Sequence, residues 1–430
     1  MDLIYMLIVV VLCAGTALLA NMGAAVFHDG LRPVVPEFLE GRMKRPELSS
    51  VAFGLSVGFI ASVGIAHTVA TGMLNPWLLF LTTDILGILS PKRWVAPILG
   101  GVWGFLAFSS LTLIDLVLTG LPVDLIGAMG TLSDPVIAGF ALFPLVAIFM
   151  QFGWRKGLIA ALITLLVRQF VVVFTNIFPE SIQVFVGVLL LVIFAITNDM
   201  KDKESKPAEG FEDNVLSMRT ARIRKNAPWL MAVGGLIALA ANVGVFAGSE
   251  VSIYTLAEAH AQTDAGIRQN LINQAAMAEF MRGLGFIPLI VTTAITTGVY
   301  GVAGLTFVYV VGYLMPHPIL ALAGGAVIIL IEIFLLGFVG KGLGKFPSMR
   351  AASDNIRSAM TTVMEFALLI GSINAVVVMG GYAGFFIAGM IYLVNELTGR
   401  RIMRMAIGPV AAIATGIALN LLHLVGLFPI

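Results

Sequence analysis

The chain is dominated by apolar runs that are long enough to cross a lipid bilayer as helices. Hydrophobic residues make up 59% and charged residues 11% of its 430 residues, whereas soluble proteins carry about 25% charged residues. So few charges could not cover a soluble surface of this size. The composition therefore excludes a soluble globular enzyme and predicts an all-α membrane protein whose surroundings are the lipid bilayer.

Twelve apolar runs are candidate crossings, because a bilayer core about 30 Å thick requires roughly 20 residues of helix. The basic clusters, which include Arg32 and Arg357, should lie in cytoplasmic loops. They all fall on one side only if a further run, 286–314, enters and leaves by the same face. We therefore expect about 12 crossings plus a re-entrant hairpin at 286–314. The runs are 3–20, 51–71, 77–90, 95–119, 136–153, 157–177, 182–198, 229–246, 319–340, 359–379, 383–398 and 405–428.

A charged stretch, residues 199–228, divides the chain into two membrane halves, residues 1–198 and 229–430. We interpret it as a cytoplasmic linker. The first half is predicted to begin out-to-in and the second in-to-out, which is the pattern of an inverted repeat with discontinuous helices. A local match agrees with this, since Gly58-Phe59-Ile60 leads to Gly72 as Gly285-Phe286-Ile287 leads to Gly298, with one gap.

Short apolar segments that Gly or Pro interrupts are the best sequence indication of a transport site. The first half has two, 77–90 and 121–134, and they carry Asp84 and Asp124. A carboxylate at membrane depth costs at least about 2.5–3.5 kcal/mol, so each could hold a proton or Na⁺. Each could equally cap a helix at the membrane surface. The N-termini of half-helices in such segments would present N–H groups to an anionic or polar solute.

The second half has its own candidate site within residues 250–297. Glu279 and Arg282 are three residues apart and could form an ion pair on one helix face. Hydroxyl and amide groups at this density suit a polar lining, although a solvated amphipathic helix and threonines bonded to their own helix carbonyls would explain them too. The candidate binding residues in this stretch are Glu250, Asn273, Glu279, Arg282, Thr293 and Thr297.

Three charged residues lie inside otherwise apolar runs: Arg168, Glu332 and Glu365. An intramembrane charge indicates a functional site or a buried structural pair. By charge alone, we expect Arg168 to pair with Glu332 or Glu365.

Other classes of site and partner are not indicated. The net charge of +1 argues against nucleic acid as a partner, because phosphate binding requires a strongly basic face. No His, Cys or Asp spacing matches a zinc or iron site, and neither a P-loop nor a G-x-S-x-G motif occurs. We therefore expect no metal, no cofactor and no enzymatic activity.

Five runs of residues carry a family resemblance: Val26–Pro33, Thr83–Gly87, Leu121–Asp124, Gly248–Ser252 and Ala278–Phe286. They resemble the YhfT family of bacterial inner-membrane proteins, and the resemblance spans nearly the whole chain. It implies a multi-pass transporter of the bacterial inner membrane, without a substrate and without catalytic residues. It also places Asp84, Asp124, Glu250, Glu279 and Arg282 inside the matching runs.

These observations predict a secondary active transporter that moves a small polar or anionic metabolite by alternating access. H⁺ or Na⁺ would be carried by a carboxylate among Asp84, Asp124 and Glu279, with Arg282 as a partner of substrate or carboxylate. One alternative is a phosphotransferase-type permease subunit that needs soluble partners. Another is a non-transporting scaffold or receptor that docks through 199–228. A homodimer is expected by analogy with transporters of this architecture.

Overall fold

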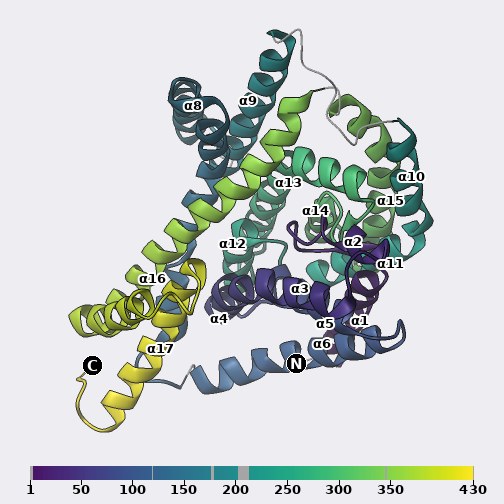
Figure 1. Ribbon diagram of the computed structural model, residues 1–430. Coiled ribbons are helices and arrows are strands. Elements are labelled where there is room, and N and C mark those ends of the chain that lie inside the picture. The colour runs from purple at the N-terminus through teal and green to yellow at the C-terminus, as the bar shows by residue number, and fades with distance from the viewer. Residues whose placement is uncertain (1–2, 119, 176–178, 202–212, 344–345, 430) are drawn as a thin grey trace.

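The computed structural model describes residues 3–118, 120–175, 179–201, 213–343 and 346–429, and these are almost entirely helical (Figure 1). Among them, seven helices are long and apolar enough to cross a membrane, and three shorter helices are apolar. The all-α class is therefore confirmed, and the apolar helices indicate a membrane protein by length and composition. The prediction of twelve crossings stays an expectation. The helices are α1 Leu3–Asn21, α2 Val35–Leu39, α3 Arg45–Phe59, the π-helix η1 Ile60–Ile65, α4 Ala66–Thr71, α5 Pro76–Leu89, α6 Val95–Leu118, α7 Leu125–Gly130, α8 Ser133–Phe174, α9 Pro179–Lys201, α10 Asp213–Lys225, α11 Ala227–Asn242, α12 Glu250–Ala261, α13 Ala265–Thr297, α14 Phe307–Leu314, α15 Pro318–Leu343, α16 Pro347–Leu397 and α17 Arg404–Leu424; the strands are β1 Ala25–Val26 and β2 Tyr300–Gly301.

Two of the longest helical elements, α8 and α16, fold back on themselves at glycines. Gly153 has φ 77° and ψ 179°, and Gly381 has φ 52° and ψ −127°. A methyl group at Gly157 would collide with the Phe149 ring, and one at Gly384 would collide with the Val376 carbonyl. In a straight helix, residues eight positions apart are separated by about 12 Å, whereas these residues are in contact. Each element therefore consists of two helical arms joined by a turn. The sequence places its run boundaries at these same turns.

The structure differs from the expected hairpin at 286–314. Its first arm is the C-terminal part of α13, which begins at Ala265 and continues the polar run into the apolar one without interruption. The chain is then irregular up to Thr306, and α14 follows with only eight residues. The segment is therefore a broken helix whose first arm is far longer than the sequence indicated.

The breaks in the two halves pair with each other. Ala25 lies opposite Tyr300 in the parallel pair of β1 with β2, and Leu74 forms a parallel bridge with Phe246. The Tyr300 N–H donates to the Ala24 carbonyl (3.0 Å), and the Ala247 N–H to the Leu74 carbonyl (2.9 Å). In apolar surroundings, irregular backbone persists only where protein groups satisfy it. Each half therefore supplies hydrogen-bond partners for the break of the other.

Left-handed glycines end the helices that lead into two of these breaks. Gly72 follows α4 with φ 66°, and Gly298 follows α13 with φ 68°. Only glycine adopts this conformation readily, and it is the usual way to end a helix. The chain can therefore leave each helix at a sharp angle and enter the paired strand.

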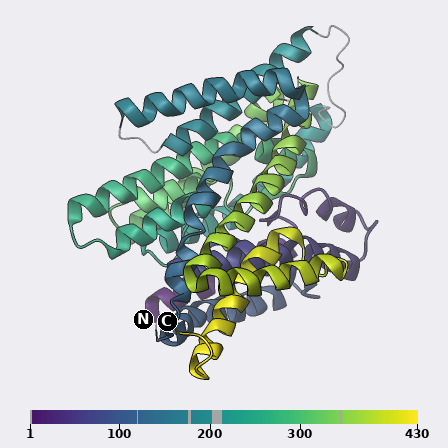
Figure 2. The same cartoon turned by 90° about the vertical axis from the view of Figure 1, so that its left-hand side faces the viewer.

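The helices form two groups, which Figure 1 shows side by side. The core bundle comprises α1, α5, α6, α11, α14 and α15, and the flanking bundle comprises α8, α9, α16 and α17. Helices α12 and α13 lie between them. Figure 2 shows α8 and α16 running together through the flanking bundle, as their contacts require.

The predicted linker is partly helical and is attached to the core. Helix α10 packs against α13 and α15, and the Arg222 guanidinium donates to the carbonyl of Gly23 (2.9 Å). Residues 202–212 of the linker lie outside the described residues.

Close helix packing in the core bundle predicts which glycines tolerate a side chain. Gly100 of α6 faces α1, where a Cβ atom would collide with the Cys13 carbonyl and lie 2.6 Å from Cβ of Ala17. We expect Gly100→Val to lower the free energy of unfolding by about 1–3 kcal/mol, because overpacking forces the backbones apart. Thermal unfolding of the purified protein in detergent measures this.

Gly389 of α16 is the matched control, because a Cβ atom there meets nothing within 4 Å. Gly389→Ala should be neutral or stabilising by about 0.5–1 kcal/mol, since alanine suits a helix better than glycine. Equal destabilisation by both substitutions would contradict the packing described for α1 and α6.

Candidate binding cavity between the two halves

A cavity of about 340 Å³ lies where the breaks of the two halves meet. Its wall comes from the loop after β1, from α3 and the start of α5 in the first half, and from α12, α13 and the break before α14 in the second. The flanking bundle closes it with α16 and with Met403 before α17. Both the volume and the mixed apolar and polar wall are typical of a small-molecule site.

Aromatic rings form the apolar part of this wall. The Phe59 ring stacks on Trp77 with 5.0 Å between centroids, and the Phe27 ring meets Trp77 edge-on at 5.4 Å. Phe286 of α13 also lines the cavity. Such rings offer flat apolar surface to a ligand at little cost in side-chain entropy.

A cluster of three charges lies at the second half's wall, which two of them, Glu250 and Arg282, line. The Arg282 guanidinium pairs with Glu279 at 2.9 Å, which confirms the expected ion pair. Glu279 is fully buried and accepts hydrogen bonds from the hydroxyls of Ser249 (2.5 Å) and Ser252 (2.6 Å). Glu250 lines the cavity, accepts from the Trp77 indole (3.2 Å) and lies in electrostatic range of Arg282 and Glu279. Two carboxylates thus lie near one guanidinium, and one of them, Glu279, pairs with it.

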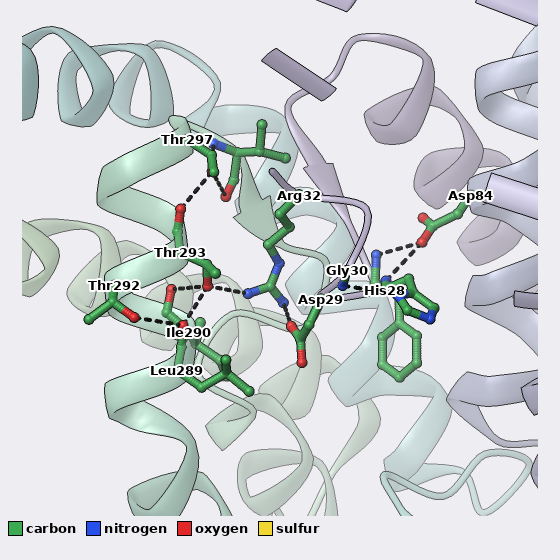
Figure 3. A network of polar contacts seen from close by, with 12 residues as sticks. His28, Asp29, Gly30, Arg32, Asp84, Leu289, Ile290, Thr292, Thr293 and Thr297 are labelled. Atoms are coloured by element: carbon green, nitrogen blue, oxygen red, sulfur yellow. Dashed lines mark hydrogen bonds and ion pairs between the residues drawn. The ribbon is translucent and has the colours of Figure 1, made fainter. Parts of the chain in front are cut away.

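Arg32 connects the two halves across the cavity wall (Figure 3). Its guanidinium pairs with Asp29 at 2.7 Å and donates to the Thr293 hydroxyl of α13 at 3.1 Å. The residue is only 3% exposed. From the sequence, Arg32 belongs to a basic cluster expected in a cytoplasmic loop, and that side of the membrane stays a prediction; burial of the side chain was not expected. In the sequence, Asp29 three residues before Arg32 was the one indication that Arg32 could form an ion pair.

Asp84 shapes the wall from behind without lining the cavity. One of its carboxylate oxygens accepts the backbone N–H groups of Phe27 (2.8 Å) and His28 (3.0 Å), as Figure 3 shows. The carboxyl group is fully buried, and its other oxygen has no hydrogen-bond partner among the described residues. Asp84 therefore positions the loop whose side chains face the cavity.

At the N-termini of the two half-helices, α5 and α14, side chains of the protein accept some of the N–H groups that were expected to face a solute. The Asn75 side chain caps α5 by accepting from the Leu78 N–H (3.1 Å). Before α14, Glu332 accepts from the Leu305 N–H (2.8 Å) and from the Tyr300 hydroxyl (2.9 Å). Side chains of the protein thus already occupy these positions, and Glu332 serves the break rather than pairing with Arg168.

The expected threonine lining also differs. The Thr293 hydroxyl donates to the Leu289 carbonyl of its own helix and accepts from Arg32. The Thr297 hydroxyl donates to the Thr293 carbonyl (2.6 Å) and accepts from the Val299 N–H (3.1 Å). Both residues stabilise the end of α13, and neither lines the cavity.

Two further candidates lie apart from the cavity. Asp124 is exposed and caps α7 by accepting from the Gly127 N–H (2.9 Å). Asn273 is exposed on α13, where Gln269 donates to it (3.0 Å). The structure thus shows a capping role for Asp124 and a surface position for Asn273.

The expected pairing of Arg168 was wrong as well. Its guanidinium lies 2.7 Å from the Glu180 carboxylate. Glu180 begins α9, the helix after α8, so the two residues meet where the chain turns back. Glu365 is half-buried on α16, away from this pair. Within the described ranges, His, Cys, Asp and Glu form no group of three that could hold a metal ion.

Comparison with known proteins finds relatives without an assigned activity. The model of a family described as "YhfT: Protein of unknown function" matches residues 5–428. A curated protein of Escherichia coli (strain K12), "Uncharacterized protein YhfT", is 53% identical over 434 residues, which cover 100% of this chain and 99% of that protein. No solved structure matches.

The two N–H groups that Asp84 accepts predict graded effects of substitution. Asp84→Ala leaves both donors buried without an acceptor, at about 1–3 kcal/mol each. Asp84→Asn keeps one carbonyl oxygen and should cost less. Thermal unfolding in detergent should therefore rank the two variants, with alanine the less stable, and the opposite order would contradict the described hydrogen bonds.

Proposed function

The chain belongs to the YhfT family, and on that premise we propose that it is a secondary active transporter of the bacterial inner membrane. It would carry a small polar or anionic metabolite by alternating access. The observation that carries the proposal is the cavity at the meeting point of the two breaks, because its wall combines both halves of the chain with both helix bundles. Sites at such crossings of discontinuous helices are typical of secondary transporters.

The order of elements supports two related halves. The sequence of α1, α3 to α4, α5, α6, α8 and α9 has counterparts in α11, α13, α14, α15, α16 and α17. The backbone pairs between the halves agree with this correspondence. The strand after α1 pairs with residues that follow Gly298, and Phe246, after α11, pairs with Leu74, which follows Gly72. This exchange is what two units related by an approximate twofold axis would produce, and we propose that they have inverted topology.

The one-residue gap in the sequence match between the halves has a structural counterpart. Gly58 precedes Gly72 by 14 positions, and Gly285 precedes Gly298 by 13. The longer segment contains the π-helix η1, Ile60–Ile65, whereas α13 is continuous. A π-bulge accommodates an extra residue within a helix and is frequent at functional sites. The two segments therefore fit a common origin with one insertion.

Alternating access would follow from movement of one bundle against the other. The cavity lies at their contact, where Arg357 and Met360 of α16 face Phe27 and Trp77 from the core side. A rigid shift of the flanking bundle would uncover the cavity on one side and cover it on the other. Bound substrate would lie at the contact between the two bundles and would move with one bundle.

The coupling cation would bind at the cluster of Glu250, Glu279 and Arg282. Two carboxylates and one guanidinium leave one surplus negative charge in buried surroundings. Such a charge is costly unless it is neutralised, and a proton or Na⁺ would neutralise it. Because Glu250 also lines the cavity, cation binding and substrate binding would influence each other.

Flux measurements in proteoliposomes test this proposal. Purified protein is supplied with an inward H⁺ or Na⁺ gradient, and a panel of organic acids, amino acids, sugars and nucleosides is screened for accumulation and for exchange. We expect Glu250→Gln to abolish gradient-driven accumulation while exchange persists, because the surplus charge that needs the cation is gone.

Glu258→Gln on the same helix is the matched control, because Glu258 is exposed, and it should leave both activities unchanged. Undiminished accumulation in Glu250→Gln and Glu279→Gln would remove the cluster from the mechanism. Absence of any substrate-dependent flux by the unmodified protein would remove transport itself.

A further inference from the structure

Among the residues that the structure describes, Arg357 is a cation of the cavity wall without a close buried counterion. Arg32 pairs with Asp29 and Arg282 with Glu279, both within 3 Å. Arg357 of α16 instead lies 3.7 Å from Asp354, whose side chain is 72% exposed. Its buried Nε–H has no hydrogen-bond partner among the described residues. The wall therefore presents one guanidinium that is available to an anion.

A second group in the same wall is also unused. Thr306 has φ 78°, a left-handed conformation that a β-branched residue adopts rarely. It is 8% exposed, it lines the cavity, and its hydroxyl has no partner within the described part of the chain. Strained residues of this kind cluster at ligand sites. The hydroxyl is thus a donor or acceptor available to a ligand.

From these two groups and the aromatic wall, we infer that the cavity binds a small organic acid whose carboxylate pairs with Arg357. Its flat apolar body would lie against Phe59 and Trp77, and Thr306 would hydrogen-bond a polar atom of it. The inference rests on the proposed function, because it takes this cavity as the substrate site.

The chemistry favours a single carboxylate over other anions. A guanidinium and a carboxylate match as planar groups that can form two parallel hydrogen bonds. One available arginine balances one negative charge, whereas Asp29 and Glu250 in the same wall would repel a second. A cavity of about 340 Å³ accommodates an acid with one or two rings.

Binding to the purified full-length protein in detergent tests the inference. The probes are benzoate, nicotinate and indole-3-acetate, each with its uncharged amide, and acetate as an acid without a ring. We expect at least one ring-bearing acid to raise the melting temperature and to bind in calorimetry, with its amide and acetate binding at least about 10-fold more weakly.

Variants assign the binding to the named side chains. Arg357→Gln should weaken the acid about 30-fold or more, as loss of one partner of a buried charged pair does. Arg357→Lys keeps the charge but not the paired geometry. Its affinity for the acid should lie between that of the unmodified protein and that of Arg357→Gln. The matched control Arg401→Gln removes an exposed arginine of the turn between α16 and α17 and should change nothing.

Thr306 separates binding from folding. Thr306→Gly relieves the left-handed conformation, so the melting temperature without ligand should hold or rise while binding weakens. Thr306→Ser keeps the hydroxyl and should keep the affinity. A role in stability alone would instead lower the melting temperature of the glycine variant.

Three results would overturn the inference: no acid binds, the amides bind as well as the acids, or Arg357→Gln binds the acid unchanged. Failure of the proposed function is a separate result. An acid that binds through Arg357 but is never transported would leave this site standing without transport. Transport of a neutral or cationic compound would leave transport standing without this site.

Discussion

The structure depends on one constraint, which is that backbone N–H and C=O groups inside an apolar environment must find partners within the protein. Two helices on each side of the linker stop short, and the chain at each stop is irregular. The pairs Ala25 with Tyr300 and Leu74 with Phe246 satisfy these segments across the two halves. Asp84, Asn75 and Glu332 accept hydrogen bonds from further backbone N–H groups of these segments. The cavity exists because these segments meet there without filling the space.

The charges in the cavity wall follow the same rule, because a buried charge also needs a partner within the protein. Buried arginines that hold the architecture, Arg32 and Arg282, are neutralised by carboxylates of their own segments. Glu250 and Arg357 stand apart, because one adds a negative charge to a pair that is already balanced and the other has only an exposed counterion. Glu250 lies on α12, between the two bundles, and Arg357 lies on α16 of the flanking bundle. The wall therefore carries a negative charge on one side and a positive charge on the other side of the contact along which the bundles would move.

Local features of this molecule could be predicted from the sequence, and contacts between distant segments could not. The long apolar runs, the turns near Gly153 and Gly381, and the Glu279–Arg282 pair all follow from spacing along one segment. Arg32 and Arg357 were assigned to loops because basic residues near the ends of apolar runs usually lie there. Burial of Arg32 depends on Thr293, which lies 261 positions away. Arg168 pairs with Glu180 because α9 packs beside α8. The positions of the charges along the chain do not predict this packing.

The crosswise pairing also has a consequence for how the protein is made. Ala25 and Tyr300 are 275 positions apart, and translation adds about 5–20 residues per second. The first break therefore waits tens of seconds for its partner after it has left the ribosome. During that interval its open backbone must be held by water, lipid headgroups or the insertion machinery. The first half alone lacks these backbone partners, so the cavity, whose wall includes residues of both halves, can form only after the second half has been made.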